Sequence, residues 1–130
     1  MKITFTDTAK SDIVGFLIDE GGKLPEPAEA MDKDSGGLLT EALTAGRFAG
    51  KEGQQAFVVL PKGAGAKRAL LVGAGKAKGR TDRALERIGG TIFKAQANSG
   101  FKSLDLYVAK AAEAARIGLG VKLAAYRFDD

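Results

Sequence analysis

The most informative stretch of the chain is Lys67-Arg68-Ala69-Leu70-Leu71-Val72-Gly73-Ala74-Gly75-Lys76. Its centre, residues 69–72, is a continuous apolar run, which is typical of a strand covered on both faces in a sheet with parallel strands. We expect a sharp turn at Gly73 and Gly75, because residues without a Cβ let the chain bend or approach a ligand closely. A helix-like segment begins near Thr81. The order strand, glycine turn, helix predicts an α/β domain.

Four further segments have the residue pattern of strands. Residues 2–7 alternate polar and apolar side chains, with Ile3 and Phe5 on one side, which indicates a strand near a sheet edge. The others are 12–18, more buried and with Gly15 as a bulge or close contact; 54–60, buried and ended by Pro61; and 103–108, which alternates. The strand at 54–60 either pairs with the next one as a hairpin or lies apart from it in a mixed sheet.

Helical spacing of apolar residues indicates four helices. Leu85, Ile88, Ile92 and Ala95 recur on one face of a helix that follows the N-cap candidate Thr81. Glycines 89 and 90 weaken this helix by about 1 kcal/mol each relative to alanine, so we expect a tight packing contact there. The other helices are expected at 28–34, with Pro27 in the first turn; at 38–43, with Ser35 as N-cap and Gly46 as the stop; and at 110–128.

The segment 110–128 is apolar on two sides of the expected helix. One stripe consists of Ala112, Ala115, Leu119, Leu123 and Tyr126, and the other of Ala114, Ile117, Val121, Ala124 and Phe128. A helix that is apolar on two sides is usually buried on two sides, and a chain of this size offers it one sheet face. Either another domain or subunit covers one stripe, or the helix is wedged between the sheet and the helix at 38–43.

Composition excludes several classes of function. The 130 residues include no cysteine and no histidine, which excludes disulfides, thiolate metal sites and histidine-based triads within this chain. The first residues lack an apolar signal-peptide core, and no apolar run has the length of a membrane span. We therefore expect a cytoplasmic protein with no membrane partner. The length is that of a single domain, residues 1–130.

The charge is unevenly distributed along the chain. Residues 1–46 hold 4 basic and 9 acidic side chains, whereas residues 62–94 hold 9 basic and 2 acidic ones. The basic stretch is either a patch for phosphate or nucleic acid or an ordinary solvated surface. The second interpretation is favoured, because aromatic residues are not interleaved with the charges before Phe93.

Two motifs approach known ligand-binding patterns without completing them. Residues 73–79 resemble a dinucleotide-binding glycine loop, but Gly79 follows Gly75 by four positions instead of three. A structural glycine turn is the better interpretation. Asp32, Asp34 and the nearby Glu29 form an acidic cluster that lacks the remaining ligands of a calcium loop. A solvated helix end explains it better, and no pair of carboxylates has the pattern of an acid and a base.

Several stretches together resemble the N-terminal domain of the leucyl aminopeptidase (cytosol aminopeptidase) family. They are Met1-Lys2-Ile3-Thr4-Phe5, Glu20-Gly21-Gly22-Lys23-Leu24, Ser35-Gly36-Gly37-Leu38-Leu39, Ala45-Gly46-Arg47-Phe48-Ala49-Gly50-Lys51-Glu52-Gly53-Gln54, Arg68-Ala69-Leu70-Leu71-Val72-Gly73-Ala74-Gly75-Lys76 and Leu123-Ala124-Ala125-Tyr126-Arg127-Phe128-Asp129. They occur in the family's order over nearly the whole chain, and the last resembles the junction between its two domains.

The resemblance implies a three-layer α/β fold with a mixed sheet flanked by helices, similar to macro domains. It also implies a parent metalloaminopeptidase, a homohexamer that releases N-terminal residues from peptides. Two divalent metals, zinc, manganese or magnesium, would be held in a C-terminal catalytic domain. The family's Asn-Thr-Asp metal-binding run and its catalytic Lys and Arg are absent here, so no catalytic, cofactor-binding or metal-binding residue is assigned to this chain.

We therefore interpret the chain as a non-catalytic N-terminal domain whose partner is the catalytic domain of the same parent protein. In the last helix, the stripe with Ile117 and Val121 is expected to face that partner, so their replacement by Asp should leave the fold intact. Two alternatives remain. One is a free-standing macro-like module that binds ADP-ribose or another nucleotide at residues 73–75, and the other is a DNA-contacting domain that uses residues 62–94.

Overall fold

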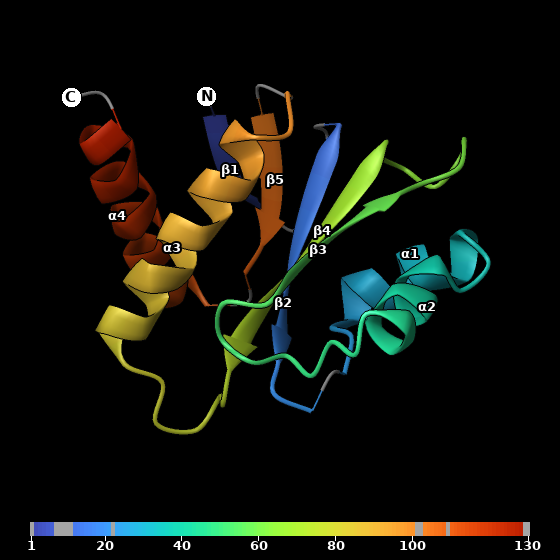
Figure 1. Cartoon of the computed structure of the whole chain (residues 1–130), viewed down its shortest axis with the longest axis horizontal. Coiled ribbons are helices and arrows are strands. Elements are labelled where there is room, and N and C mark those ends of the chain that lie inside the picture. Colours follow the sequence, from blue (N-terminus) through green and yellow to red (C-terminus); the bar gives the residue numbers. More distant parts are fainter. Residues whose placement is uncertain (1, 7–11, 22, 101–102, 109, 129–130) are drawn as a thin grey trace.

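The computed structural model describes residues 2–6, 12–21, 23–100, 103–108 and 110–128, with side chains from residue 12 to residue 127. In chain order the elements are β1 (Lys2–Thr6), β2 (Ile13–Asp19), α1 (Glu26–Asp34), α2 (Leu38–Ala45), β3 (Gln55–Val59), β4 (Arg68–Gly75), α3 (Asp82–Ala97), β5 (Ser103–Tyr107) and α4 (Ala111–Phe128). The strands form one sheet, with α3 and α4 on one face and α1 and α2 on the other (Figure 1). The predicted three-layer α/β fold is confirmed.

The described strands are arranged in the order β1-β5-β2-β4-β3, and all neighbours are parallel except β3 and β4. The mixed sheet is therefore as predicted, and β3 joins β4 as an antiparallel hairpin, one of the two alternatives. β1 lies at one edge, as its alternating pattern predicted. Gly15 in β2 makes the expected close contact, because an added Cβ would lie 2.9 Å from Cδ1 of Leu106 in β5.

β4 contributes to both hydrophobic cores. Ala69 and Leu71 point toward α1 and α2, whereas Leu70 and Val72 point toward α3 and α4, because successive strand residues face opposite sides of a sheet. All four side chains are fully buried, which confirms the prediction of a two-sided buried strand. The strand is longer than expected, since it continues through Gly73 to Gly75 before the chain turns.

The prediction that residues 54–60 form a buried strand was wrong for half of its side chains. β3 is an edge strand, in which Val58 is buried while Phe57 and Val59 are 38% and 70% exposed. An apolar run in a strand indicates burial only if both faces of that part of the sheet are covered. Here the face that carries Phe57 and Val59 extends beyond the helices.

The corner between α1 and α2 also corrects a prediction. Ser35 is the C-cap of α1, and the N-cap of α2 is Gly37, whose φ of 88° suits glycine. A carboxylate from the preceding helix supplies the missing acceptor, since the backbone N–H of Thr40 donates to Asp32 Oδ1 at 2.9 Å. Pro27 lies in the first turn of α1, and Gly46 ends α2, as predicted.

The helices α3 and α4 cross at very short range. A Cβ on Gly89 would collide with the carbonyl oxygen of Ile117, and a Cβ on Gly120 would collide with the carbonyl oxygen of Glu86. The tight contact predicted for the glycine pair in α3 is therefore real, although it involves Gly89 alone. The N-cap of α3 is Thr81, as predicted, and its hydroxyl accepts from the N–H of Ala84 at 3.1 Å.

Candidate functional site

The glycine-rich end of β4 is occupied by another part of the protein. The N–H of Gly73 donates to the carbonyl of Gln54 at 2.7 Å, and the N–H of Gly75 donates to that of Gly50 at 2.8 Å. A Cβ on Gly73 would collide with the carbonyl oxygen of Lys51. The backbone groups that would cradle a phosphate are thus bonded to the loop 48–54, and the glycines serve close packing of that loop.

Arg80 holds the same end of the sheet together. Its Nη2 donates to Asp19 Oδ1 at 2.6 Å and to the carbonyl of Gly75 at 3.2 Å, and its Nη1 lies 3.8 Å from Glu113 Oε2. The Arg80 side chain is 9% exposed, and its Nε has no hydrogen-bond partner in the described part of the chain. One guanidinium therefore links β2, β4 and the first turn of α4. The sequence gives no local sign of this, since Asp19 lies 61 positions away.

The acidic cluster near residue 32 has a structural role. Both carboxylate oxygens of Asp32 accept from Thr40, one from the N–H and the other from the hydroxyl. Among the described residues, no group of three or more Asp or Glu side chains is positioned to hold a metal ion. The two divalent metals that the family resemblance implies belong to the C-terminal catalytic domain, and the described residues offer no such set of ligands.

The basic stretch 62–94 is divided among separate regions of the surface. Lys67 lies just before β4 and is 3.8 Å from Asp12, whereas Lys76 and Lys78 follow the other end of the strand. An eight-residue strand keeps these ends roughly 25 Å apart. Arg80 is buried under the sheet end. The positive charges therefore do not form one continuous patch for a polyanion.

A hollow lies between α3 and α4 and has a volume of about 620 Å³. Gly90, Gly120, Leu123 and Ala124 give it an apolar lining. It exists because small residues at the helix crossing leave space beside the contact. This groove could not be predicted from the sequence, because it depends on how the two helices cross.

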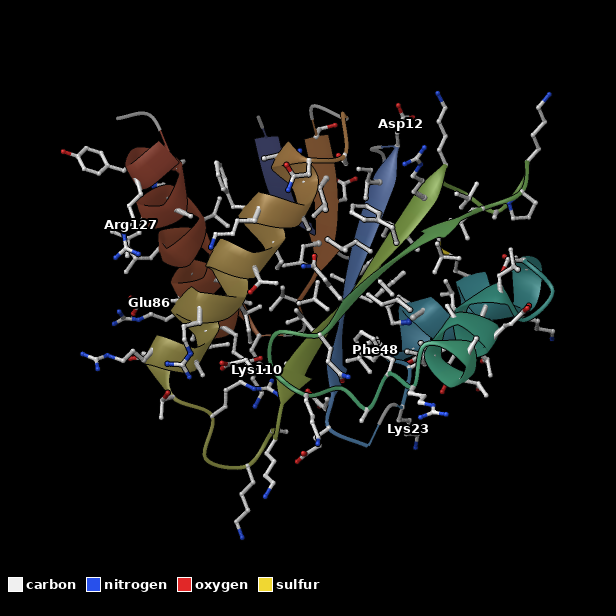
Figure 2. The ribbon with its side chains drawn as sticks, viewed as in Figure 1. Asp12, Lys23, Phe48, Glu86, Lys110 and Arg127 are labelled. Atoms are coloured by element: carbon white, nitrogen blue, oxygen red, sulfur yellow. The ribbon has the colours of Figure 1, made fainter. Side chains whose placement is uncertain are left out.

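Charged side chains surround the groove. Arg87 forms two hydrogen bonds to the Glu52 carboxylate, of 2.9 and 3.0 Å. The pKa of Arg87 is raised above its ordinary value, mainly by these hydrogen bonds and to a smaller extent by the negative charge of Glu52. Glu86 lies 3.4 Å from Arg116. Figure 2 shows Glu86 near the outer edge of the helix pair, on the same side as Arg127.

The outer face of α4 carries an uncovered apolar stripe. Leu119, Leu123 and Tyr126 are 39%, 45% and 74% exposed, whereas Ile117 is fully buried against α3 and the sheet. The prediction that the stripe with Ile117 and Val121 faces a partner was wrong. Ile117 of that stripe belongs to the core and Ala114, Val121 and Ala124 are half-buried, whereas the other stripe is exposed. Periodicity showed two stripes, but it could not tell which one packs inward.

Comparison with known proteins identifies the family. A family described as "Cytosol aminopeptidase family, N-terminal domain" matches residues 13–130. This chain belongs to the cytosol aminopeptidase family and corresponds to its N-terminal domain. The part of the chain that the structure describes has no helix long and apolar enough to cross a membrane.

Individual relatives of the cytosol aminopeptidase family agree with this assignment. A probable cytosol aminopeptidase of Caulobacter vibrioides is 37% identical over an alignment of 134 positions, which covers 99% of this chain and 27% of that protein. One from Chelativorans sp. is 33% identical over 92% of this chain and 25% of its own length. The chain thus spans about a quarter of these relatives. A solved structure of a tomato leucine aminopeptidase mutant has the same fold, with a TM-score of 0.73 at 23% identity, over 95% of this chain and 28% of that one.

Proposed function

We propose that residues 1–130 form one non-catalytic N-terminal domain of a longer aminopeptidase, whose catalytic domain lies outside this chain. That enzyme would release N-terminal amino acids from peptides. The observation that supports the proposal is the coverage, since 99% of the chain matches only 27% of the Caulobacter vibrioides relative. Three quarters of such a protein would then carry other functions, catalysis among them.

The proposal assigns no catalytic, cofactor-binding or metal-binding residue to this chain. In the proposed parent enzyme, two divalent metals, zinc, manganese or magnesium, would activate a water molecule and polarise the scissile carbonyl. Carboxylates that such metals would need are engaged otherwise here, as Asp32 is with Thr40 and Glu52 with Arg87. The role of this domain would be architectural: it would shape access to the active site and support assembly of a cytoplasmic homohexamer.

Activity measured on two polypeptides tests this proposal. We expect the complete polypeptide encoded by the gene to hydrolyse leucine p-nitroanilide with Mn²⁺ or Zn²⁺ and to lose this activity in EDTA. The 130-residue chain should be inactive under the same conditions. Light scattering on the active species should give the mass of a hexamer. The proposal fails if the complete polypeptide releases no amino acid with any of the three metals, or if this chain alone is active.

A further inference from the structure

We propose that the outer face of α4 and the adjoining groove form the surface on which the catalytic part of the longer polypeptide docks. The α4 outer face is defined here by Ala112, Ala115, Leu119, Leu123 and Tyr126. This inference rests on the proposed function, because it requires that a longer polypeptide exists.

The α4 outer face is apolar along the length of the helix. Leu119, Leu123 and Tyr126 follow one another at spacings of four and three residues, which places them in one row. Each is more than a third exposed, although the opposite side of the helix is fully buried at Ile117. A contiguous exposed apolar strip of this kind marks an interaction site, because isolated surface apolar residues are common but rows of them are not.

The groove extends this strip toward α3. Leu123 belongs to both, since it lines the groove and also lies on the α4 outer face. Gly90 and Gly120 open the groove at the helix crossing, and its volume of about 620 Å³ accommodates a few side chains of a partner. The α4 outer face and the groove together have the apolar centre expected of a protein interface.

The charges around the groove indicate the chemistry of the partner. Glu52 and Glu86 are each bonded to an arginine of this chain. In contrast, Arg83, Lys94 and Arg127 line the groove without an ion pair in the described part of the chain. The unpaired charges that line the groove are therefore positive, so the partner should present carboxylates at the rim and apolar side chains at the centre.

Two observations favour the same polypeptide as the partner over a second copy of this chain. The family matched is an N-terminal domain, and the match covers 27% of the Caulobacter vibrioides relative, so about three quarters of that protein lies outside the matched part. A tethered partner has an effective concentration in the millimolar range and can use a surface of modest size. A twofold dimer through this face would instead bring the unpaired cations Arg83, Lys94 and Arg127 of both copies toward each other.

Nitration of Tyr126 by tetranitromethane measures whether the α4 outer face is covered. In the 130-residue chain Tyr126 is 74% exposed and should react readily, whereas Tyr107, which stacks on Phe16 at 5.1 Å, is an internal reference for the folded state. In the complete polypeptide we expect nitration of Tyr126, followed by peptide mass spectrometry, to slow at least about tenfold, which corresponds to about 1.4 kcal/mol of docking.

Substitutions in the complete polypeptide complete the test. Leu123→Asp should restore the nitration rate of Tyr126 to that of the 130-residue chain, while Val59→Asp, an equally drastic change at an exposed apolar position on β3, should not. If Leu123→Asp unfolds the protein, Arg127→Glu tests the charged rim in its place and should also restore nitration.

Three results would overturn the inference: equal nitration of Tyr126 in both polypeptides, no effect of Leu123→Asp, or concentration-dependent protection of Tyr126 in the 130-residue chain, which would mean a second copy. Each is independent of the release of leucine that tests the proposed function.

Discussion

Two glutamines of this protein have opposite surroundings and should respond in opposite ways to the same substitution. Gln96 is fully buried on α3, and neither its Nε2 nor its Oε1 has a hydrogen-bond partner in the described part of the chain. Gln54 Oε1 accepts from the N–H groups of Ala49 and Lys51, both at 3.0 Å. A buried amide without partners costs about 1–3 kcal/mol, whereas a satisfied one stabilises the fold.

We expect Gln96→Met to raise the free energy of unfolding by about 1–2 kcal/mol, because a methionine of similar shape removes the unpaired polar atoms. Gln54→Met should lower it by about 1–3 kcal/mol, since two loop N–H groups lose their acceptor. Urea denaturation of the 130-residue chain followed by circular dichroism gives both values. A loss of stability in Gln96→Met would show that its amide is satisfied in solution.

Arg80 and Arg83 are a second contrasting pair, separated by three positions. The Arg80 side chain is 9% exposed and donates to Asp19 and Gly75, while Arg83 is exposed on α3. We expect Arg80→Met to cost about 1–3 kcal/mol, most of it from the lost hydrogen bonds, because Asp19 is 54% exposed and its charge is screened by water.

Arg83→Met should change the unfolding free energy by less than about 0.5 kcal/mol, as is usual for surface positions. Thermal unfolding of both variants at pH 7 measures the contrast. If both substitutions changed the unfolding free energy by the same amount, the hydrogen bonds of buried Arg80 would not stabilise the fold. The sequence could not distinguish these arginines, because the carboxylate that pairs with Arg80, that of Asp19, lies 61 positions away.

At the scale of elements, the crossing of α3 and α4 assigns different roles to two adjacent glycines. A Cβ on Gly89 would collide with the backbone of α4, whereas a Cβ on Gly90 would meet no described atom within 4 Å. Gly89→Ala should therefore force the helices apart and cost about 1–3 kcal/mol. Gly90→Ala should stabilise α3 by about 0.5–1 kcal/mol, through the higher helix propensity of alanine.

Chemical denaturation of both variants in the 130-residue chain provides the measurement, and each serves as the control for the other. If both substitutions stabilised the protein, the helices would not be in close contact in solution. If both destabilised it by the same amount, the pair would act through the backbone of α3 alone.

Elements with strong local signals could be predicted from the sequence, and those that depend on tertiary context could not. β4 and α3 were found because an uninterrupted apolar run, a helical repeat and the Thr81 cap are encoded by nearby residues. The Ser35 cap was predicted wrongly because the acceptor for α2 comes from Asp32 in another helix. The exposure of Val59 depends on the extent of the helices over the sheet, which is set by packing.

At the scale of the whole molecule, α4 separates the interior of the protein from its proposed docking surface. Ile117 lies fully buried in the core between the sheet and the helices, while Leu123 is 45% exposed on the other side. Ile117→Asp should abolish the cooperative thermal transition of the 130-residue chain, because an unpaired carboxylate cannot be buried there without a large cost. Leu123→Asp should leave the transition midpoint within about 3 °C of the original, as a change at an exposed site costs little.

Circular dichroism during heating distinguishes these outcomes. Folding of Ile117→Asp with an unchanged midpoint would contradict the assignment of that side to the core. Of the candidate site, the sequence revealed the amphipathic repeat of the last helix and the family resemblance. The groove and the choice of the buried side required the three-dimensional arrangement, since both arise from the contact of Gly89 and Gly120 with the facing helix.

The sheet order has a consequence for how this protein is made. β5 lies between β1 and β2, although those two strands are neighbours in the chain and β5 follows β1 by about 100 residues. At the usual synthesis rate of 5–20 residues per second, β1 and β2 leave the ribosome about 5–20 s before the strand that must separate them. If they pair with each other during that interval, they must part again before β5 can enter, so correct closure of the sheet depends on how weakly the first two strands bind one another.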